Sequence, residues 1–411
     1  MNRNQFSLLL FLVVVVGLGG LLVYNKQNDA GKSGNAALGK KLLPNFPVND
    51  ISHIAISQGT NKLDLAKKDG TWRVRERNDY PANYNQISEF LLKAADLKIV
   101  QTEQVGPSQL GRLELLPGQG TNAALQVDFK DQNDKQLQTL LLGKKHMQKS
   151  RTPSPYGDLG DNGWPDGRYV QVGGKSGEVD VISDALANVE PKADQWLDKD
   201  FFKVDKVRTI AVQFPEQTNS WKLTRETETG EWKLADARPT EQLDSSKTSS
   251  VSNPLSSPSF NDVDTTSKPE QLGLDKPTLV SLDTFDNFTY NLKVGQKTND
   301  NFPLLVSVAA QLPKERTPGK DEKAEDKDKL DKQFKEQQKK LQDKLAQEQA
   351  FQNWTYLVSS WTLEPLLKTR TQLLVEKKEE PKKDETKKDE KPATATSEAP
   401  KSSEAESDAA Q

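Results

Sequence analysis

The chain has 411 residues, of which 57 are Lys or Arg and 60 are Asp or Glu, so its formal net charge is −3. This near balance, without a compact basic stripe, argues against nucleic acid as a partner. Cysteine is absent, which excludes disulfides, thiolate metal sites and cysteine nucleophiles. Only 34% of the residues are hydrophobic, and charged residues gather in particular segments, so we expect an ordered body with solvated appendages.

The first segment is a candidate membrane anchor. Residues 6–24 read FSLLLFLVVVVGLGGLLVY, without a charge, and at about 1.5 Å per residue such a helix just spans a hydrocarbon core of about 30 Å. We predict an uncleaved transmembrane anchor over 1–25 and a flexible tether over 26–48, with a cleaved signal peptide as the alternative. Long domains translocate largely regardless of nearby charge, so the expected location is the bacterial inner membrane, single pass, with an extracytoplasmic body.

Two short stretches, PSQLG at 107–111 and PEQLG at 269–273, belong to a longer correspondence between two halves of the body. Each half starts with an alternating apolar strand, passes a polar hairpin, a Trp and the PxQLG motif, and reaches paired strands that end in Gly. The order of these landmarks predicts a tandem duplication, with a first repeat at 49–204 and a second repeat at 205–374. The matched segments are 51–57 and 207–213, Trp72 and Trp232, Pro117 and Pro277, 125–142 and 280–294, and 167–172 and 353–358.

Each repeat is predicted to run hairpin, helix, hairpin, strand, helix. The second repeat has a Ser-rich run at 243–260 where the first has its clearest helix, so that helix should be short or lost. Short helices are also expected at 181–189, 193–202 and 362–374. Strands with segregated helices predict an α+β fold. The apolar face of the first helix consists of Ile87, Phe90, Leu91, Ala94 and Leu97.

These motifs resemble a bacterial family called domain of unknown function 4340. The resemblance rests on the Trp after a DG-like turn, on LGLDKP at 272–277 and on the strand end at Gly295, whereas 110–117 departs by a longer spacing. It covers about residues 49–374. Family members are commonly membrane-anchored envelope proteins, and some are similar to the auxiliary component encoded beside gliding-motility ABC transporters. The resemblance carries no catalytic residues and implies a scaffold.

Two further segments are strongly charged. The insertion at 313–351 should contain a long charged helix, because helix formers with opposite charges four residues apart dominate from Glu322 onward. Its apolar positions are too sparse for sustained heptads, so a solvated helix is favoured over a partner-binding coiled coil. Residues 375–411 cannot bury apolar surface and are predicted to be disordered.

No string of residues carries a recognisable catalytic or cofactor motif. The GxxxxGK spacing at 34–40 has Lys41 where a P-loop needs Ser or Thr and follows no strand, so a nucleotide is not expected. Neither His53 nor His146 has a His or Cys at metal-ligand spacing, and no GxSxG elbow is present. We therefore predict no enzyme activity, no metal and no cofactor, although carboxylates brought together by folding would be invisible in the sequence.

The stretch 156–169, YGDLGDNGWPDGRY, is the richest in chemistry. Its carboxylates could offer oxygen ligands to calcium, and its rings could stack on a sugar or pack on a protein. A turn-rich hairpin tip is the alternative, because Asp, Asn, Gly and Pro are turn residues. The candidate contact residues are Tyr156, Asp158, Asp161, Trp164 and Tyr169.

The leading interpretation is a non-enzymatic, membrane-anchored cell-envelope protein whose duplicated body scaffolds or regulates a membrane complex. The family resemblance suggests an ABC-type transporter as the protein partner. The alternative is an envelope glycan or polymer binder, or a hydrolase of such a polymer, that uses the 156–169 stretch.

Overall fold

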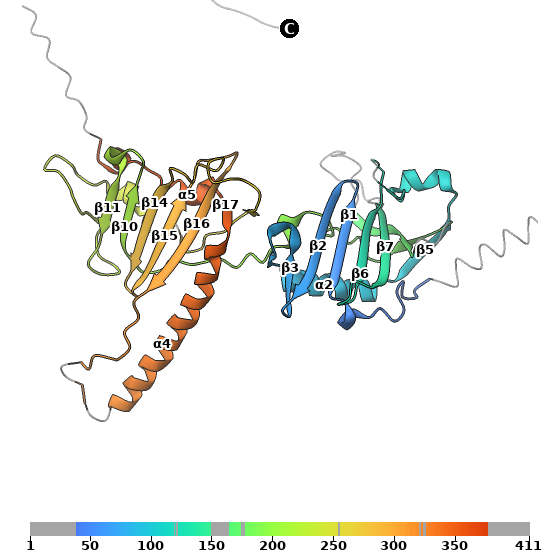
Figure 1. Ribbon diagram of the computed structural model, residues 1–411, viewed down its shortest axis with the longest axis horizontal. Coiled ribbons are helices and arrows are strands. Elements are labelled where there is room, and N and C mark those ends of the chain that lie inside the picture. Colours follow the sequence, from blue (N-terminus) through green and yellow to red (C-terminus); the bar gives the residue numbers. More distant parts are fainter. Residues whose placement is uncertain are drawn as a thin grey trace, which may run out of the picture. The chain divides into compact units, whose positions relative to one another are not determined.

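Two large antiparallel sheets follow one another along the chain in the computed structural model (Figure 1). The structure describes residues 38–118, 120, 122–148, 164–173, 177–253, 255–319, 322–323 and 326–376. The first sheet has the strand order β4-β3-β2-β1-β6-β7-β8-β9-β5. Its strands are β1 (His53–Gln58), β2 (Asn61–Lys68), β3 (Thr71–Val74), β4 (Tyr80–Pro81), β5 (Ile99–Gln104), β6 (Leu125–Lys130), β7 (Gln136–Gln148), β8 (Trp164–Val172) and β9 (Glu178–Ile182).

The second sheet repeats this order. It runs β12-β11-β10-β14-β15-β16-β17-β13. This order matches the first sheet strand by strand if β12 is aligned with β3 and β13 with the edge strand β5. Apolar and polar residues alternate along the strands, so the inward face of each sheet is apolar. Ile54 and Ile56 of β1 and Ile210 and Val212 of β10 are all buried there. The strands are β10 (Val207–Gln213), β11 (Trp221–Thr224), β12 (Lys233–Leu234), β13 (Asp262–Asp264), β14 (Thr278–Thr284), β15 (Phe288–Val294), β16 (Asn301–Ala310) and β17 (Thr355–Ser359).

Helices are few. Among the described α-helices only α2 (Tyr84–Asp96) and α4 (Lys327–Gln349) exceed five residues. The side chain of Asn83 caps α2 by accepting from the Gln86 amide at 3.1 Å. The apolar face of α2 packs on the first sheet, where the ring of Phe90 lies 5.7 Å from the ring of Phe129 in β6. The shorter elements are α3 (Ser245–Ser249), α5 (Ser360–Leu363), η1 (Val48–Asp50), η2 (Arg75–Arg77), η3 (Pro107–Leu113), η4 (Ala193–Trp196), η5 (Gln217–Asn219), η7 (Ala350–Asn353) and η8 (Arg370–Leu373).

The α+β prediction is therefore wrong, because most of the regular structure is antiparallel sheet. The helix predicted at 181–189 does not form. Its first residues belong to β9, where the β-branched Val179 and Val181 alternate with Asp180 in the pattern of a strand. The stretch 193–202 yields only the single turn η4. The stretch 362–374 divides into α5 and η8 around Pro365, which disfavours helix at the preceding residue.

No helix in the described part of the chain is long and apolar enough to cross a membrane. This finding contradicts the prediction that the protein crosses the inner membrane once. The stretch behind that prediction, residues 1–25, lies outside the described residues, as do 26–37 and 377–411. The longest described helix, α4, is rich in Lys, Asp and Glu and buries only Glu348.

One predicted correspondence between the repeats also needs correction. The strand at 167–172 was matched to 353–358, but the shared strand order pairs β8 with β16 and β9 with β17. Only residues 173–177 separate β8 from β9 in the sequence, whereas the whole charged insertion with α4 lies between β16 and β17. The insertion thus separated two strands that are neighbours in the first repeat and concealed the true match.

The PxQLG motif and the strand-end glycine have a joint packing role. In the first repeat the motif forms η3, and a Cβ added at Gly143 in β7 would overlap the Leu113 carbonyl oxygen. In the second repeat a Cβ added at Gly295 would overlap the Leu272 carbonyl oxygen. Each glycine therefore lets the motif loop lie directly on the strand end.

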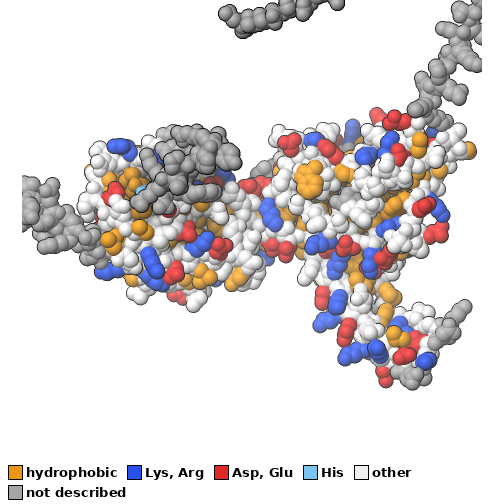
Figure 2. Space-filling model, turned by 180° about the vertical axis from the view of Figure 1, so that it is seen from behind, with side chains coloured by type: hydrophobic (Ala, Val, Ile, Leu, Met, Phe, Trp, Pro, Cys, Tyr) orange, Lys and Arg blue, Asp and Glu red, His pale blue; other side chains and the backbone are white. Residues whose placement is uncertain are grey.

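Helix α4 is fastened at both ends. Near its C-terminus, Glu348 accepts from the Tyr290 hydroxyl at 2.7 Å and from the Lys203 amide at 3.0 Å. At its other end, Arg316 bonds to Glu322 and, at 2.8 Å, to Asp331. Charged side chains of both signs cover the arm that α4 forms (Figure 2, lower right). The helix is thus held as an ordered arm of the second repeat.

Both sheets lie in one compact unit that extends to Leu374. Arg77 of the first repeat donates to both carboxylate oxygens of Asp262 in β13, each at 2.7 Å. Beside this ion pair, Tyr80 of β4 lies edge-on to the Phe260 and Trp354 rings. Charge-assisted bonds and aromatic packing therefore connect the repeats.

Candidate binding cavity

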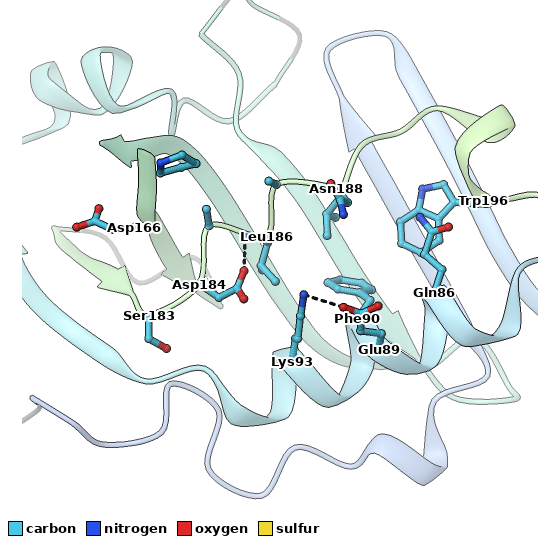
Figure 3. Close-up of a pocket in the computed structure, with 14 residues that line it drawn as sticks. Gln86, Glu89, Phe90, Lys93, Asp166, Ser183, Asp184, Leu186, Asn188 and Trp196 are labelled. Carbon is cyan, nitrogen blue, oxygen red and sulfur yellow. Dashed lines mark hydrogen bonds and ion pairs between the residues drawn. The ribbon is translucent and has the colours of Figure 1, made fainter. Parts of the chain in front are cut away.

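A cavity of about 370 Å³ lies in the first repeat between α2 and the loop 183–189, which follows β9 (Figure 3). The α2 wall consists of Gln86, Glu89, Phe90 and Lys93. The loop contributes the opposite wall, and Pro165 and Asp166 at the start of β8 close one end. A volume of this size falls in the range of small-ligand sites, roughly 300–1,000 Å³.

The floor of the cavity is apolar and fixed. Trp196 and Phe90 are 1% and 4% exposed, and their rings meet edge to face at 6.0 Å. The indole nitrogen of Trp196 donates to the Glu190 carbonyl at 3.0 Å, which sets the orientation of the ring. Leu186 and Val189 from the loop add buried aliphatic surface. An apolar group entering the cavity would therefore meet a surface that is already in place.

The mouth is polar. Glu89 and Lys93 form an ion pair at 2.8 Å on the exposed side of α2. Across the cavity, Asp184 accepts from the Leu186 amide at 2.7 Å, and Figure 3 shows both interactions at the rim. Asp166 bonds to the ring of His146 at 2.6 Å. This rim can form hydrogen bonds with a polar group that stays outside the apolar floor.

The loop conformation is strained and is held by a buried arginine. Leu186 has φ of +44°, an unusual value for a bulky residue. Arg168, which is 7% exposed, donates to the carbonyl oxygens of Leu186 at 3.3 Å and Gly143 at 2.7 Å. Burial lowers the pKa of the Arg168 guanidinium. Backbone strain of this kind persists only where the surroundings impose it, and it is concentrated at functional sites.

The lining offers binding groups rather than an assembled catalytic pair. Ser183 is the hydroxyl residue of the lining, and its oxygen already accepts from the Lys98 amide at 3.1 Å. The lining residue Asp166 bonds to Nδ1 of His146, which is not itself part of the lining. Within the described ranges, no three His, Cys, Asp or Glu residues are grouped so that they could hold a metal ion.

A second cluster of titratable groups surrounds His53, which is 5% exposed. Its Nδ1 lies 2.6 Å from Asp134 and its Nε2 lies 2.8 Å from Asp64. Only the imidazolium can donate to both carboxylates. The bond to Asp64 raises the pKa of His53 above its ordinary value, against the opposing effect of burial, and the bond to Asp134 adds to the rise. Since both ring nitrogens are engaged, His53 joins β1, β2 and the β6–β7 turn.

The predicted contact residues are only partly placed by the structure. Tyr156, Asp158 and Asp161 lie outside the described residues. Trp164 begins β8 opposite Gln148. Tyr169 lies half-buried on the same strand, with its ring 5.9 Å from that of His146.

The sequence did not reveal the cavity. Among its lining residues the sequence singled out Phe90, through the helical pattern of α2, and Pro165 and Asp166, as part of the stretch 156–169. Leu186 and Trp196 fall in stretches that were interpreted as helices, and nothing in their spacing shows that the two loops meet α2. Asp166 and His146, which are hydrogen-bonded at the rim, are twenty residues apart in the sequence, and the pairing of β7 with β8 brings them together.

The fold and the cavity define a class of protein: a tandem pair of like-ordered antiparallel sheets with a ligand-sized cavity beside the helix of the first. Residues 158–277 match the family model described as a domain of unknown function (DUF4340), which is consistent with the resemblance that the sequence motifs indicate. The match runs from before β8 to just before β14, across the junction of the repeats. The likeness to gliding-motility auxiliary proteins is not confirmed. No curated protein and no solved structure matches the chain.

Proposed function

We propose that the protein is a non-enzymatic scaffold that binds a partner protein, and that the partner inserts an apolar side chain into the cavity beside α2. The observation that carries this proposal is the cavity itself, with its rigid aromatic floor and its polar mouth. Burying a Leu- or Phe-sized side chain there contributes about 1.5–3 kcal/mol. A few buried anchors of this kind dominate the energetics of protein interfaces.

The state of the histidines supports a role without catalysis. A general base needs a free ring nitrogen within hydrogen-bond reach of the proton it removes. His53 uses both nitrogens for carboxylates. His146 bonds to Asp166 through Nδ1 and packs its ring on Tyr169, so its Nε2 stays available. Neither imidazole has a serine or threonine hydroxyl as a hydrogen-bond partner among the described residues.

The ordered arm of the second repeat also supports a scaffold. In proteins most helical stability comes from tertiary contacts. Here Glu348 fixes its base and Arg316 fixes its far end to the returning chain, while Gln338 donates to the Pro313 carbonyl at 2.9 Å. A preorganised arm loses little conformational entropy when it binds.

The test is crosslinking in native cells, followed by affinity recovery of the full-length chain and mass spectrometry. Gln86→Trp fills the cavity mouth, and Leu92→Trp, on an exposed position of the same helix, is the matched control. We expect one protein partner that is lost with Gln86→Trp and retained with Leu92→Trp. Equal recovery with both variants would contradict the proposed cavity. Recovery of wall polymer alone would instead favour the glycan-binding alternative.

A further inference from the structure

A second concavity of the first repeat, of about 470 Å³, lies where the PxQLG loop meets the end of β7. Its cationic residues are Arg112 on the loop and Lys144 and Lys145 on the strand. Val105 and Leu113 form an apolar base, and Tyr169 and His146 stand at one side. We call this feature the basic concavity.

Most of the positive charge of the basic concavity has no ion-pair partner within the described part of the chain. Arg112 and Lys144 form no ion pair there, whereas the charge of Lys145 also acts on the Glu190 carboxylate, outside the lining. The lining contains one carboxylate, Glu103, which accepts from the Gln101 side chain at 2.9 Å. Three cations therefore face one carboxylate around a hollow surface.

The second repeat provides an internal comparison. Aligning the two PxQLG motifs places Leu274 at the position of Arg112. Aligning Gly143 with Gly295 places Gln296 at the position of Lys144 and Lys297 at that of Lys145. Lys297, the one cation that remains, pairs with Glu364 at 2.9 Å.

The comparison of the two repeats distinguishes the contacts that pack the loop from the charges that could bind a ligand. In each repeat a carbonyl oxygen of the loop packs on the strand-end glycine, from Leu113 in the first repeat and from Leu272 in the second, so this packing does not need the three cations. Only the first repeat has all three cations, and Arg112 and Lys144 form no ion pair among the described residues. Free cations clustered in a concavity are a means of attracting and holding an anion.

We infer that the basic concavity is a binding site for a ligand that carries phosphate groups, separate from the partner cavity. The Arg112 guanidinium can donate to two phosphate oxygens at once, and the two lysines add point charges that suit a multiply charged anion. The Tyr169 hydroxyl and Nε2 of His146, whose Nδ1 is held by Asp166, offer further polar contacts. The apolar base leaves room for an uncharged portion of the ligand.

The test uses isothermal titration calorimetry on the full-length chain with inorganic pyrophosphate at low ionic strength. The variant Arg112→Leu/Lys144→Gln removes two positive charges and carries the residues that the second repeat has at the aligned positions. Each charge-assisted bond to the anion contributes roughly as much as a tenfold change in affinity. We therefore expect Kd to rise at least about tenfold in the double variant and to stay unchanged in the control Lys297→Gln.

Three outcomes would overturn the inference. They are undetectable binding of pyrophosphate to the unmodified chain, an unchanged Kd in the double variant, and an equal loss in the Lys297→Gln control. Citrate serves as the carboxylate competitor, and if it binds as tightly as pyrophosphate, the assignment to phosphate is wrong. A thermal melt of each variant separates a lost contact from a lost fold.

Discussion

Tyr290 donates its hydroxyl hydrogen to Glu348 across 2.7 Å, in a site where both side chains are buried. This bond joins β15 of the second sheet to the last turn of α4. The other carboxylate oxygen accepts from the Lys203 amide. Glu348 is therefore the residue that fixes the base of the arm.

Glu348→Ala should destabilise the second repeat, because it leaves the Lys203 amide without its acceptor and the Tyr290 hydroxyl with the longer bond to the Lys203 carbonyl, at 3.1 Å. Leaving buried groups unpaired costs about 1–3 kcal/mol. Urea denaturation measures the loss. The control Glu336→Ala removes an exposed carboxylate from the same helix and should change the free energy of unfolding by less than about 0.5 kcal/mol. Equal effects of the two substitutions would contradict the proposed anchor.

The strand-end glycines should tolerate no side chain. Gly295→Ala forces a Cβ against the Leu272 carbonyl and should cost about 1–3 kcal/mol, the usual range for overpacking. Gly319→Ala is the control, since a Cβ there has open space. Thermal melts of the two variants should differ clearly, and a Gly295→Ala protein as stable as Gly319→Ala would show that the loop can move aside.

The His53 cluster should make stability depend on pH above neutrality. The pKa of His53 is raised in the folded chain, so its contribution is complete below the unfolded value of about 6.5 and is lost as pH rises through the higher folded value. The pKa values of Asp64 and Asp134 are lowered by the same bonds, so their contributions are lost in acid. Glu76, Arg75 and Lys130 also act on this cluster.

Urea denaturation of the unmodified chain and of His53→Gln tests this pH dependence. The stability difference between the two proteins should be largest near pH 6 and should shrink by pH 9. A difference that is constant between these pH values would mean that His53 contributes packing alone.

The Arg370 cluster should act in the opposite pH range. Arg370 bonds to Glu241 at 2.7 and 3.0 Å and to Asp236 at 3.0 Å, and the bond from Arg370 lowers the pKa of Glu241 to about 2. Because this pKa is depressed, the stabilisation is present above the unfolded value of about 4.5 and is lost as pH falls toward 2. Glu241→Gln should flatten the acid limb of the stability profile, and an unchanged acid limb would exclude this pair as its source.

The sequence predicted the elements whose signals are local. Helix α2 has a capping Asn83 and a continuous apolar face, and β1 and β10 alternate cleanly, so periodicity sufficed for each. The weak helix of the second repeat was also foreseen, since the Ser-rich run yields only the five-residue α3. Buried alternation and capping are encoded within a few residues.

Other features depend on contacts between distant segments and had no local signal. His53 meets Asp134, 81 positions away, only because β1 and β6 pair in the sheet. Leu186 adopts its strained conformation because Arg168, on another strand, binds its carbonyl. The match of β9 with β17 was hidden by the insertion between β16 and β17. Such relationships follow from topology, which periodicity does not supply.

The central claim, a cavity that receives a partner side chain, is tested most directly by site-specific photocrosslinking. A benzoylphenylalanine placed at Asn188, on the cavity wall, should yield one discrete protein adduct in native cells. The adduct should disappear when Gln86→Trp fills the mouth, and the same crosslinker at the exposed Tyr84 should not reproduce it. No adduct from Asn188, or an adduct that persists when the mouth is filled, would contradict the proposed role of the cavity.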